Sequence, residues 1–416
     1  MAAVSNKISN GLKLILFTIV LGAVSGGVIW CFLKAVAVCS GLFRQTLSTD
    51  SFSFLPIIIC GALGAVVGVL HRKYGDYPDE LSVVMNRIKK EKYYDYRHIL
   101  PMIVCAFVPL VCLASVGPEA ALTGIIAALC YWTGDNVSFA KNNSAQYSEI
   151  GEAVALGQLF HSPLFGIFAV EETPDGEDGG VIPALTRGQK LLYYALSVGA
   201  SFLVVGLLNR LFGEAMEGFP SFSDVTIDTY DYVMMLIYIP VGVLIRFVFE
   251  FFEKVTKNAA GHIPVIIREA ACGIVIGFTV IAFPMAMSSG EEEMAHLMGT
   301  FTEYVPASLA LICVIKLFMT AFCINFGMKG GHFFPLIFSC TCMGFALSSL
   351  IFSQPAVHAP FAAAVICATV LGAMLKKPVA VSLLLLLCFP MRLLLCIFVC
   401  AAIGSRLGTL FCRTTD

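Results

Sequence analysis

The chain has 416 residues, of which 58% are apolar and only 13% are charged, and its mean hydropathy is +0.86. A soluble globular protein carries about 25% charged residues, so this composition excludes a soluble enzyme and a disordered chain. The formal net charge of −2 gives no sign of a basic face, so we expect no nucleic-acid partner. Composition therefore predicts an all-α polytopic membrane protein that is embedded in the lipid bilayer.

Uncharged runs long enough to cross a membrane recur along the chain. The first, Leu14–Leu33, is longer than the core of a signal peptide and predicts a true span. The others cover residues 54–70, 99–118, 191–209, 270–290, 333–357 and 359–375. Several contain Gly, Pro, Ser or Thr near the middle, which is typical of broken helices that line an internal cavity. The stretch from Phe333 to Leu375 is too long for one span and contains Pro355 and Pro360, so we expect at least two helices there.

The most polar stretch of the first half covers residues 71–98 and is rich in Arg and Lys. The positive-inside rule places this segment on the cytoplasmic side of the membrane, which we expect to be the plasma or inner membrane. The 16 cysteines include no Cys-x-x-Cys pair, and many lie inside apolar runs. We therefore interpret them as small buried hydrophobic residues, and we expect no metal and no cofactor.

Three sequence patterns of the first half recur in the second half at a nearly constant spacing. Leu156-Gly157 and Pro163 recur as Leu371-Gly372 and Pro378, and Gly75 before acidic residues recurs as Gly290 before Glu291–Glu293. Gly117-Pro118-Glu119 precedes Gly331-His332-Phe333 by almost the same interval. The common register predicts an internal duplication with two inverted halves, residues 1–215 and 216–416. The repeated motifs lie near residues 74–81, 117–122 and 156–172, and near residues 289–294, 330–336 and 371–378.

Glu119 is the first candidate functional residue, because about 20 uncharged residues precede it and an intramembrane carboxylate is a functional candidate by default. Gly117 breaks the chain, and Pro118 suits the first position of a new helix. Glu119 would then lie in the first turn, where backbone N–H groups and the helix dipole favour an anion. The alternative is that Glu119 only neutralises this helix end.

Gly330-Gly331 before an apolar helix is the counterpart in the second half, and it has no carboxylate of its own. Its N–H groups would be available to another anion, although a glycine-rich packing turn is the alternative. Tyr74–Leu81 predicts a loop, a proline and a short amphipathic helix. Glu171 and Glu172 end an apolar helix that begins near Pro163, and they could relay protons or be solvated end charges.

These segments, in this order, resemble the CLC family of chloride channels and proton/chloride exchangers, over residues 70 to 390. The family motif GSGIPE is echoed by residues 74–79, GxEGP by residues 117–121, and GxFxP is matched by residues 331–335. The family's APLAG turn is echoed by residues 162–166, and residues 97–101 resemble the connection between the first two motifs. The chain looks like a short bacterial-type member without regulatory C-terminal domains.

The resemblance implies a CLC-like fold of tilted, broken helices, a homodimer, and an anion path in each subunit. By resemblance, Glu119 falls on the gating glutamate, whose carboxylate leaves an anion site when it is protonated. The anion-binding positions implied are Gly75, Asp76, Gly117, Pro118, Gly331, His332, Phe333 and Phe334. By analogy, subunit contacts would involve the helices around residues 191–209 and 389–403.

The chain departs from the family pattern at three points. Gly75 replaces the central serine, no Tyr occurs after Tyr304, and Thr173 replaces the internal proton glutamate of many exchangers, beside Glu171 and Glu172. We therefore predict transport of chloride or a similar small anion by a channel or weakly coupled mechanism, with a proton-coupled exchanger as the alternative. A secondary transporter of an organic anion is less favoured. An enzyme is not expected, because no catalytic residue set is found at the membrane centre.

Overall fold

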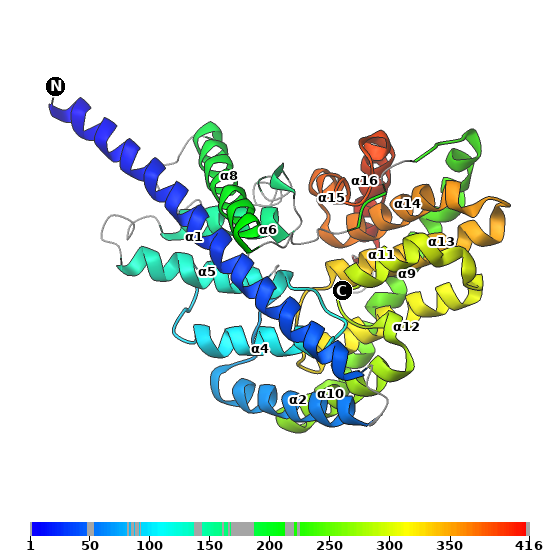
Figure 1. Cartoon of the computed structure of the whole chain (residues 1–416). Helices are drawn as coiled ribbons and strands as arrows, with labels where there is room; N and C mark the ends of the chain where they lie inside the picture. Colours follow the sequence, from blue (N-terminus) through cyan, green and yellow to red (C-terminus); the bar gives the residue numbers. More distant parts are fainter. Residues whose placement is uncertain are drawn as a thin grey trace. The chain divides into compact units, whose positions relative to one another are not determined.

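The computed structural model describes residues 2–47, 54–80, 83–84, 87, 91, 93–136, 144–159, 162–164, 167, 187–212, 220–222 and 225–412. Regular structure in this part of the chain is helical (Figure 1). The exception is one isolated antiparallel bridge between Gly117 and Gly331. The predicted all-α fold is confirmed.

The helices follow one another in a simple order. They are α1 (Ala2–Leu47), α2 (Leu55–Tyr74), α4 (Ile99–Val111), α5 (Glu119–Asn136), α6 (Ser144–Leu159), α8 (Arg187–Phe212), α9 (Thr229–Ala260), α10 (Val265–Ala282), α11 (Glu291–Thr300), α12 (Pro306–Asn325), α13 (Phe333–Ile351), α14 (Pro355–Leu375), α15 (Pro378–Leu385) and α16 (Leu394–Cys412). Short 3-10 turns are η2 (Pro284–Ala286), η3 (Phe301–Glu303) and η4 (Met391–Leu393).

Nine of the described helices are long and apolar enough to cross a membrane, namely α1, α2, α8, α9, α10, α12, α13, α14 and α16. Residues 333–375 form two helices, as predicted, because Pro355 starts α14 at a position where a missing N–H is tolerated. The run 99–118 instead contains only the short helix α4, which ends at Val111, soon after the internal Pro109. The spans in α9, α12 and α16 escaped the search for uncharged runs, because Arg246, Lys316 and Arg406 interrupt them.

The helix bounds repeat with the spacing seen in the sequence. Helix α4 ends at Val111 and its counterpart α12 ends at Asn325, while the next helices, α5 and α13, begin at Glu119 and Phe333. The interval between the two helix ends equals the interval between the two helix starts. Gly75 and Gly290, which the duplication also equates, both have positive φ angles, of 112° and 99°. The internal duplication thus extends to helix ends and loop conformation, while the boundary at residue 215 stays a prediction.

The chain groups by contact into two compact units. The first contains residues 1–35, 79–103 and 119–218, and the second contains residues 36–78, 104–118 and 219–416. In the first unit α1 packs closely on α8, since a Cβ on Gly26 would collide with Ser201, and the Trp30 indole N–H donates to Asn209 Oδ1 at 2.7 Å. Helix α6 packs between α5 and α8.

In the second unit α13 and α14 are mostly buried and pack on each other and on α9, α12 and α16. The outer helices of this unit keep large apolar side chains exposed, such as Leu236 on α9 and Leu395 on α16. Exposed apolar side chains on membrane helices face lipid, which solvates them as well as a protein core would. The described cysteine side chains are free thiols and most are buried, so the prediction of small hydrophobic residues is confirmed.

Helices α2 and α10 lie side by side in the second unit (Figure 1) and approach closely through glycines. A Cβ on Gly273 or Gly277 of α10 would collide with the backbone of α2, and a Cβ on Gly64 would collide with the carbonyl oxygen of Glu269. Small residues spaced about one turn apart let helix backbones approach closely in membranes. This packing fixes the register of α2 against α10, and it therefore positions the residues at the end of α2.

We predict that Gly64→Ala destabilises the protein by about 1–3 kcal/mol, because a methyl group there overpacks the α2–α10 contact. The measurement is unfolding of the detergent-solubilised protein by heat or denaturant. Gly206→Ala in α8 is the matched control, since a Cβ at Gly206 meets no atom of the described residues within 4 Å. Equal stability of the two variants would contradict the glycine packing.

Candidate anion site

Two loops of the second unit, each leading to a helix, are joined by a pair of reciprocal hydrogen bonds. The Gly117 N–H donates to the Gly331 carbonyl oxygen at 2.8 Å, and the Gly331 N–H donates to the Gly117 carbonyl oxygen at 2.7 Å. The two glycines are the residues that the internal duplication equates. Non-helical backbone inside a membrane needs its polar groups bonded within the protein, so each loop supplies the partners that the other lacks.

The close approach of the two loops depends on Gly330. A Cβ at this position would lie 2.6 Å from Val116 Cγ2 and 2.9 Å from the Gly117 carbonyl oxygen. Both distances are too short for a carbon atom, so a larger residue would push the loops apart. Gly330 is thus needed for close backbone approach.

The second-half loop leads directly into the N-terminus of α13. His332 is the N-cap residue of this helix, and its side chain makes no capping hydrogen bond. Phe333 and Phe334 are buried in the first turn, which contains no acidic residue. The first turn of an α-helix directs backbone N–H groups and the positive end of the helix dipole outward. The start of α13 therefore has the electrostatic character of an anion site, and the predicted helix start after Gly331 is confirmed.

Glu119 is the first residue of α5 and its side chain is 1% exposed. It belongs to the first unit and follows Pro118 of the second unit by one peptide bond. The Thr123 hydroxyl donates to the Glu119 carbonyl oxygen at 2.9 Å, which orders this first turn. A buried carboxylate at a helix start is the arrangement that the sequence predicted, while its gating role stays a prediction.

Gly75 and Asp76 lie where α2 ends. Gly75 caps α2 with a φ angle of 112°, a conformation that favours glycine. The Asp76 carboxylate accepts from Lys329 Nζ at 2.7 Å, and Lys329 lies just before Gly330 and Gly331. This ion pair links the first motif to the loop of the third, so two of the three sequence motifs share one region of the second unit.

The pKa of Asp76 lies below its ordinary value. Burial by itself raises the pKa of this carboxyl, but the positive charges of Lys329, His71 and Arg268 together outweigh burial. Asp76 is therefore a carboxylate at neutral pH, and its negative charge makes it a fixed partner for Lys329 more than a ligand for an anion. The Gly75 backbone N–H donates to the His71 carbonyl oxygen at 3.0 Å. The two predicted binding residues here thus make bonds within the protein, and their role in anion binding stays a prediction.

Sequence reasoning missed Lys316, whose side chain is fully buried in α12. Its Nζ donates to the carbonyl oxygens of Met287 and Ser288, both at 2.7 Å. Ser288 in turn donates its backbone N–H to the Leu113 carbonyl oxygen at 2.9 Å, so Lys316 supports the loop that holds the chain before Gly117. The signal was present, because Lys316 is the one charged residue between Glu303 and Lys329, and a lone charge in an apolar run is a functional candidate.

The model of the family described as voltage gated chloride channel matches residues 63–409. The chain belongs to the voltage-gated chloride channel (CLC) family. Members of this family are channels and transporters of anions, so the expectation that the chain is not an enzyme agrees with its family. Among curated protein sequences, none matches this chain.

Solved structures of CLC proteins share the fold of this chain. A CLC-type fluoride/proton antiporter is 21% identical, with a TM-score of 0.71 over 95% of this chain and 94% of that one. A slow cyanobacterial Cl⁻/H⁺ antiporter is 15% identical, with a TM-score of 0.76 over 97% and 98%. A eukaryotic CLC transporter is 16% identical, with a TM-score of 0.71 over 96% of this chain and 72% of that one.

Apart from Glu119, the predicted site residues of this CLC protein thus fall into three groups. Gly117, Pro118 and Gly331 are brought together by the bridge, with His332, Phe333 and Phe334 next to it in α13. Gly75 and Asp76 are linked to that loop through Lys329. The proton-path candidates Glu171, Glu172 and Thr173 lie outside the described residues, so their roles stay predictions.

We predict that Gly330→Ala lowers chloride flux in liposomes by roughly tenfold, which corresponds to about 1.4 kcal/mol of lost stabilisation of the bound anion. The reason is that a Cβ at Gly330 separates the two bridged loops. Gly261→Ala at the end of α9 is the control, because a Cβ there meets its nearest atoms at 3.6 Å with a φ of −63°. Unchanged flux in both variants would show that the bridge does not shape the anion path.

Proposed function

We propose that this CLC protein transports chloride or a similar small inorganic anion across the membrane, with Glu119 as the gate. The observation that carries the proposal is the reciprocal bridge between Gly117 and Gly331. It joins two loops that lead into helix N-termini, one of which starts with a carboxylate and the other of which has none in its first turn.

The physical difficulty is that an unpaired anion in a low-dielectric medium costs tens of kcal/mol in the Born limit. A helix N-terminus carries about half a positive charge, and several together offset this cost without a fixed cation. Two cations near the loops are already engaged, since the buried Lys316 bonds two carbonyl oxygens and the partly exposed Lys329 bonds Asp76. An anion held by backbone dipoles is bound weakly enough to leave again.

Glu119 suits a gate because its carboxylate is an anion that competes for the same kind of site. An ionised carboxylate at a helix N-terminus is stabilised by the N–H groups and the dipole there. Protonation removes that attraction, so the side chain leaves and the transported anion takes its place. This mechanism makes anion flux depend on pH in either a channel or an exchanger.

Coupling to protons is proposed to be loose. Thr173 cannot carry a proton charge where many exchangers have a second carboxylate, and Gly75 lacks the side-chain hydroxyl that would hold an inner anion. The alternative is a stoichiometric exchanger, since two of the structural neighbours are described as a fluoride/proton and a Cl⁻/H⁺ antiporter. Transport of an organic anion is the less favoured alternative.

The test is anion efflux from liposomes loaded with chloride, fluoride or a small organic acid, with simultaneous recording of external pH. We predict flux of the small inorganic anions only. Glu119→Gln mimics the protonated side chain, so its flux should persist and lose its pH dependence, whereas an imposed chloride gradient should drive little uphill proton movement in the native protein.

Each result has its own consequence. Persistence of the native pH dependence in Glu119→Gln would reduce Glu119 to a helix-end charge. Strong, stoichiometric proton pumping that Glu119→Ala abolishes would establish the exchanger instead. Flux of the organic acid at the same rate as chloride would overturn the proposed substrate class.

The partner proposed in the membrane is a second copy of the chain, through helices α8 and α16. Leu203 on α8 and Leu236 on α9 are equally exposed, each at 77%, but only Leu203 lies on a proposed contact helix. We predict that Leu203→Trp shifts the detergent-solubilised protein from dimer to monomer in light scattering, while Leu236→Trp does not. A native protein that is monomeric in mild detergent and still transports chloride would contradict the dimer.

A further inference from the structure

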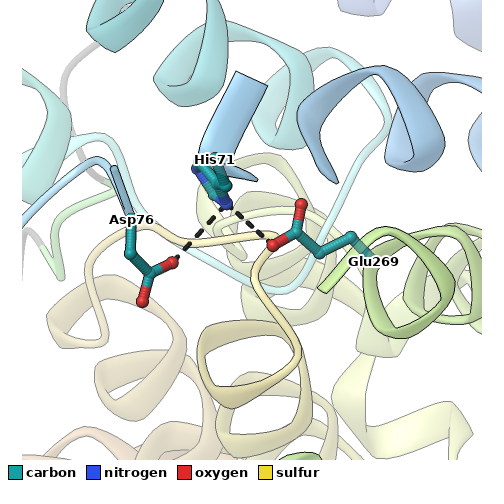
Figure 2. A group of neighbouring side chains, drawn as sticks. All are labelled: His71, Asp76 and Glu269. Carbon is teal, nitrogen blue, oxygen red and sulfur yellow. Dashed lines mark hydrogen bonds and ion pairs between the residues drawn. The ribbon is translucent and has the colours of Figure 1, made fainter. Parts of the chain in front are cut away.

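The close glycine packing of α2 against α10 brings a histidine and a glutamate together inside the second unit. His71, in the last turn of α2, and Glu269, in the first turns of α10, are both buried, and His71 Nδ1 lies 2.8 Å from Glu269 Oε1. Figure 2 shows the imidazole between the Glu269 carboxylate on one side and Asp76 on the other. Nothing in the family motifs quoted above includes either His71 or Glu269.

Both ring nitrogens of His71 face oxygen atoms. Nε2 bonds the backbone carbonyl oxygen of Tyr77, which can only accept, so Nε2 carries a hydrogen. Two lone pairs cannot face each other at 2.8 Å, so a second proton must lie between Nδ1 and Glu269 Oε1. Whether that proton is assigned to the ring or to the carboxyl, the pair holds one proton more than a neutral histidine beside a carboxylate.

The pair of His358 and Asp231 shows why this geometry is special. His358 Nδ1 lies 2.8 Å from Asp231 Oδ1, the same distance as in the first pair. A neutral histidine that donates from Nδ1 satisfies this contact without an extra proton. His71 differs from His358 because its other ring N–H already donates to the carbonyl oxygen of Tyr77, so its contact with Glu269 needs an additional proton.

Charged groups from each neighbouring element surround the pair. Arg268 on α10 donates to Glu269 Oε1 at 3.0 Å, Asp76 Oδ1 lies 3.5 Å from His71 Nδ1, and Lys329 bonds Asp76. On α2 itself Arg72 and Lys73 are exposed, and the thiols of Cys105 and Cys272 lie within electrostatic range of Glu269. With its extra proton, the cluster of His71, Arg268, Lys329, Asp76 and Glu269 has three positive and two negative groups. Without that proton its charges balance.

The carboxylate of Glu269 keeps capacity for a proton. Its Oε2 is buried and has no hydrogen-bond partner among the residues that the structure describes. Gly327, at a φ angle of 95°, leaves room for the side chain, since a Cβ there would collide with it. A metal ion suits this cluster poorly, because Arg268 and Lys329 already neutralise its two carboxylates. A mobile proton, unlike a divalent cation, fits a cluster that already contains two fixed positive charges.

We propose that His71 and Glu269 form a proton-binding site whose occupancy is linked to anion binding at the start of α13, to which the ion pair of Asp76 and Lys329 connects the cluster. The inference rests on the proposed anion transport and assigns a proton site to the side of the membrane that segment 71–98 faces. The pair would supply a titratable site on that side of the membrane, although Thr173 stands where many exchangers have a proton-carrying glutamate.

The linkage follows from the charge balance. The protonated cluster has one excess positive charge and attracts an anion, and the bound anion in turn stabilises the proton. Because binding linkage is reciprocal, each ligand raises the affinity for the other by the same factor. Such a pair makes anion binding sensitive to pH without requiring stoichiometric exchange.

The test is isothermal titration of the detergent-solubilised full chain with potassium chloride in buffers of different ionisation enthalpy, which measures protons taken up per chloride bound. All comparisons use the Glu119→Gln background, so that protonation of the gate does not contribute. We expect proton uptake to persist in this background, with chloride affinity about fivefold or more higher at low pH than at high pH.

Two further substitutions in this background move chloride affinity in opposite directions. His71→Gln removes the proton and leaves the cluster balanced, so chloride binds weakly at every pH. Glu269→Gln also removes the shared proton, because its amide donates to Nδ1, but it leaves one excess positive charge, so chloride binds tightly at every pH. Damage to the fold would lower the affinity in both variants, whereas the proposal requires opposite changes.

His358→Gln is the matched control and should keep both the proton uptake and its pH dependence. Proton uptake that survives His71→Gln and Glu269→Gln unchanged would overturn the proposal, as would a parallel loss of affinity in both variants. Failure of the proposed function looks different, since chloride would then give no binding heat in any variant, native protein included.

Discussion

The pair of hydrogen bonds between Gly117 and Gly331 is the constraint on which the rest of the site depends. In a bilayer, backbone that leaves a helix must find its hydrogen-bond partners inside the protein, since lipid offers none. Each loop solves this problem for the other, and the missing Cβ of Gly330 lets them approach. Because α13 starts almost directly after Gly331, the hydrogen bonds between the two loops also fix the position of the N-terminus of α13.

Charged side chains in this protein bond to the loops around the site, whereas the positive character of the helix N-termini comes from backbone dipoles. Lys316 bonds two carbonyl oxygens of the loop before α11, and Lys329 bonds Asp76 at the end of α2. A buried charge without a partner is costly, so each cation is placed where carbonyl or carboxylate oxygens already need a donor. In the proposed mechanism the transported anion then meets weakly positive helix ends, which suit transport better than tight binding.

Much of the architecture follows from the sequence because its signals are local. Apolar runs long enough to span, a proline or glycine at a helix end and a carboxylate in an apolar context each depend on a few adjacent residues. They correctly placed Glu119 in the first turn of α5 and the break between α13 and α14, although α5 begins at Glu119, one residue after the predicted first position, Pro118. The constant spacing between the two halves also equated Gly117 with Gly331, since a duplication leaves its register in the chain. Charged residues within α9, α12 and α16 hid three spans, because a search for uncharged runs rejects any helix that contains a charged side chain.

Only the tertiary structure decided which distant groups meet. Nothing local to residue 71 indicates that its imidazole faces Glu269, because that contact depends on glycines of α2 and α10 that let two helix backbones approach. The pairing of Gly117 with Gly331 by two hydrogen bonds is also a property of the folded chain, although the sequence equated the two residues. Local pattern thus determined where helices begin and end, while close packing between helices determined the partners of the buried charges, because those partners lie far apart in the sequence.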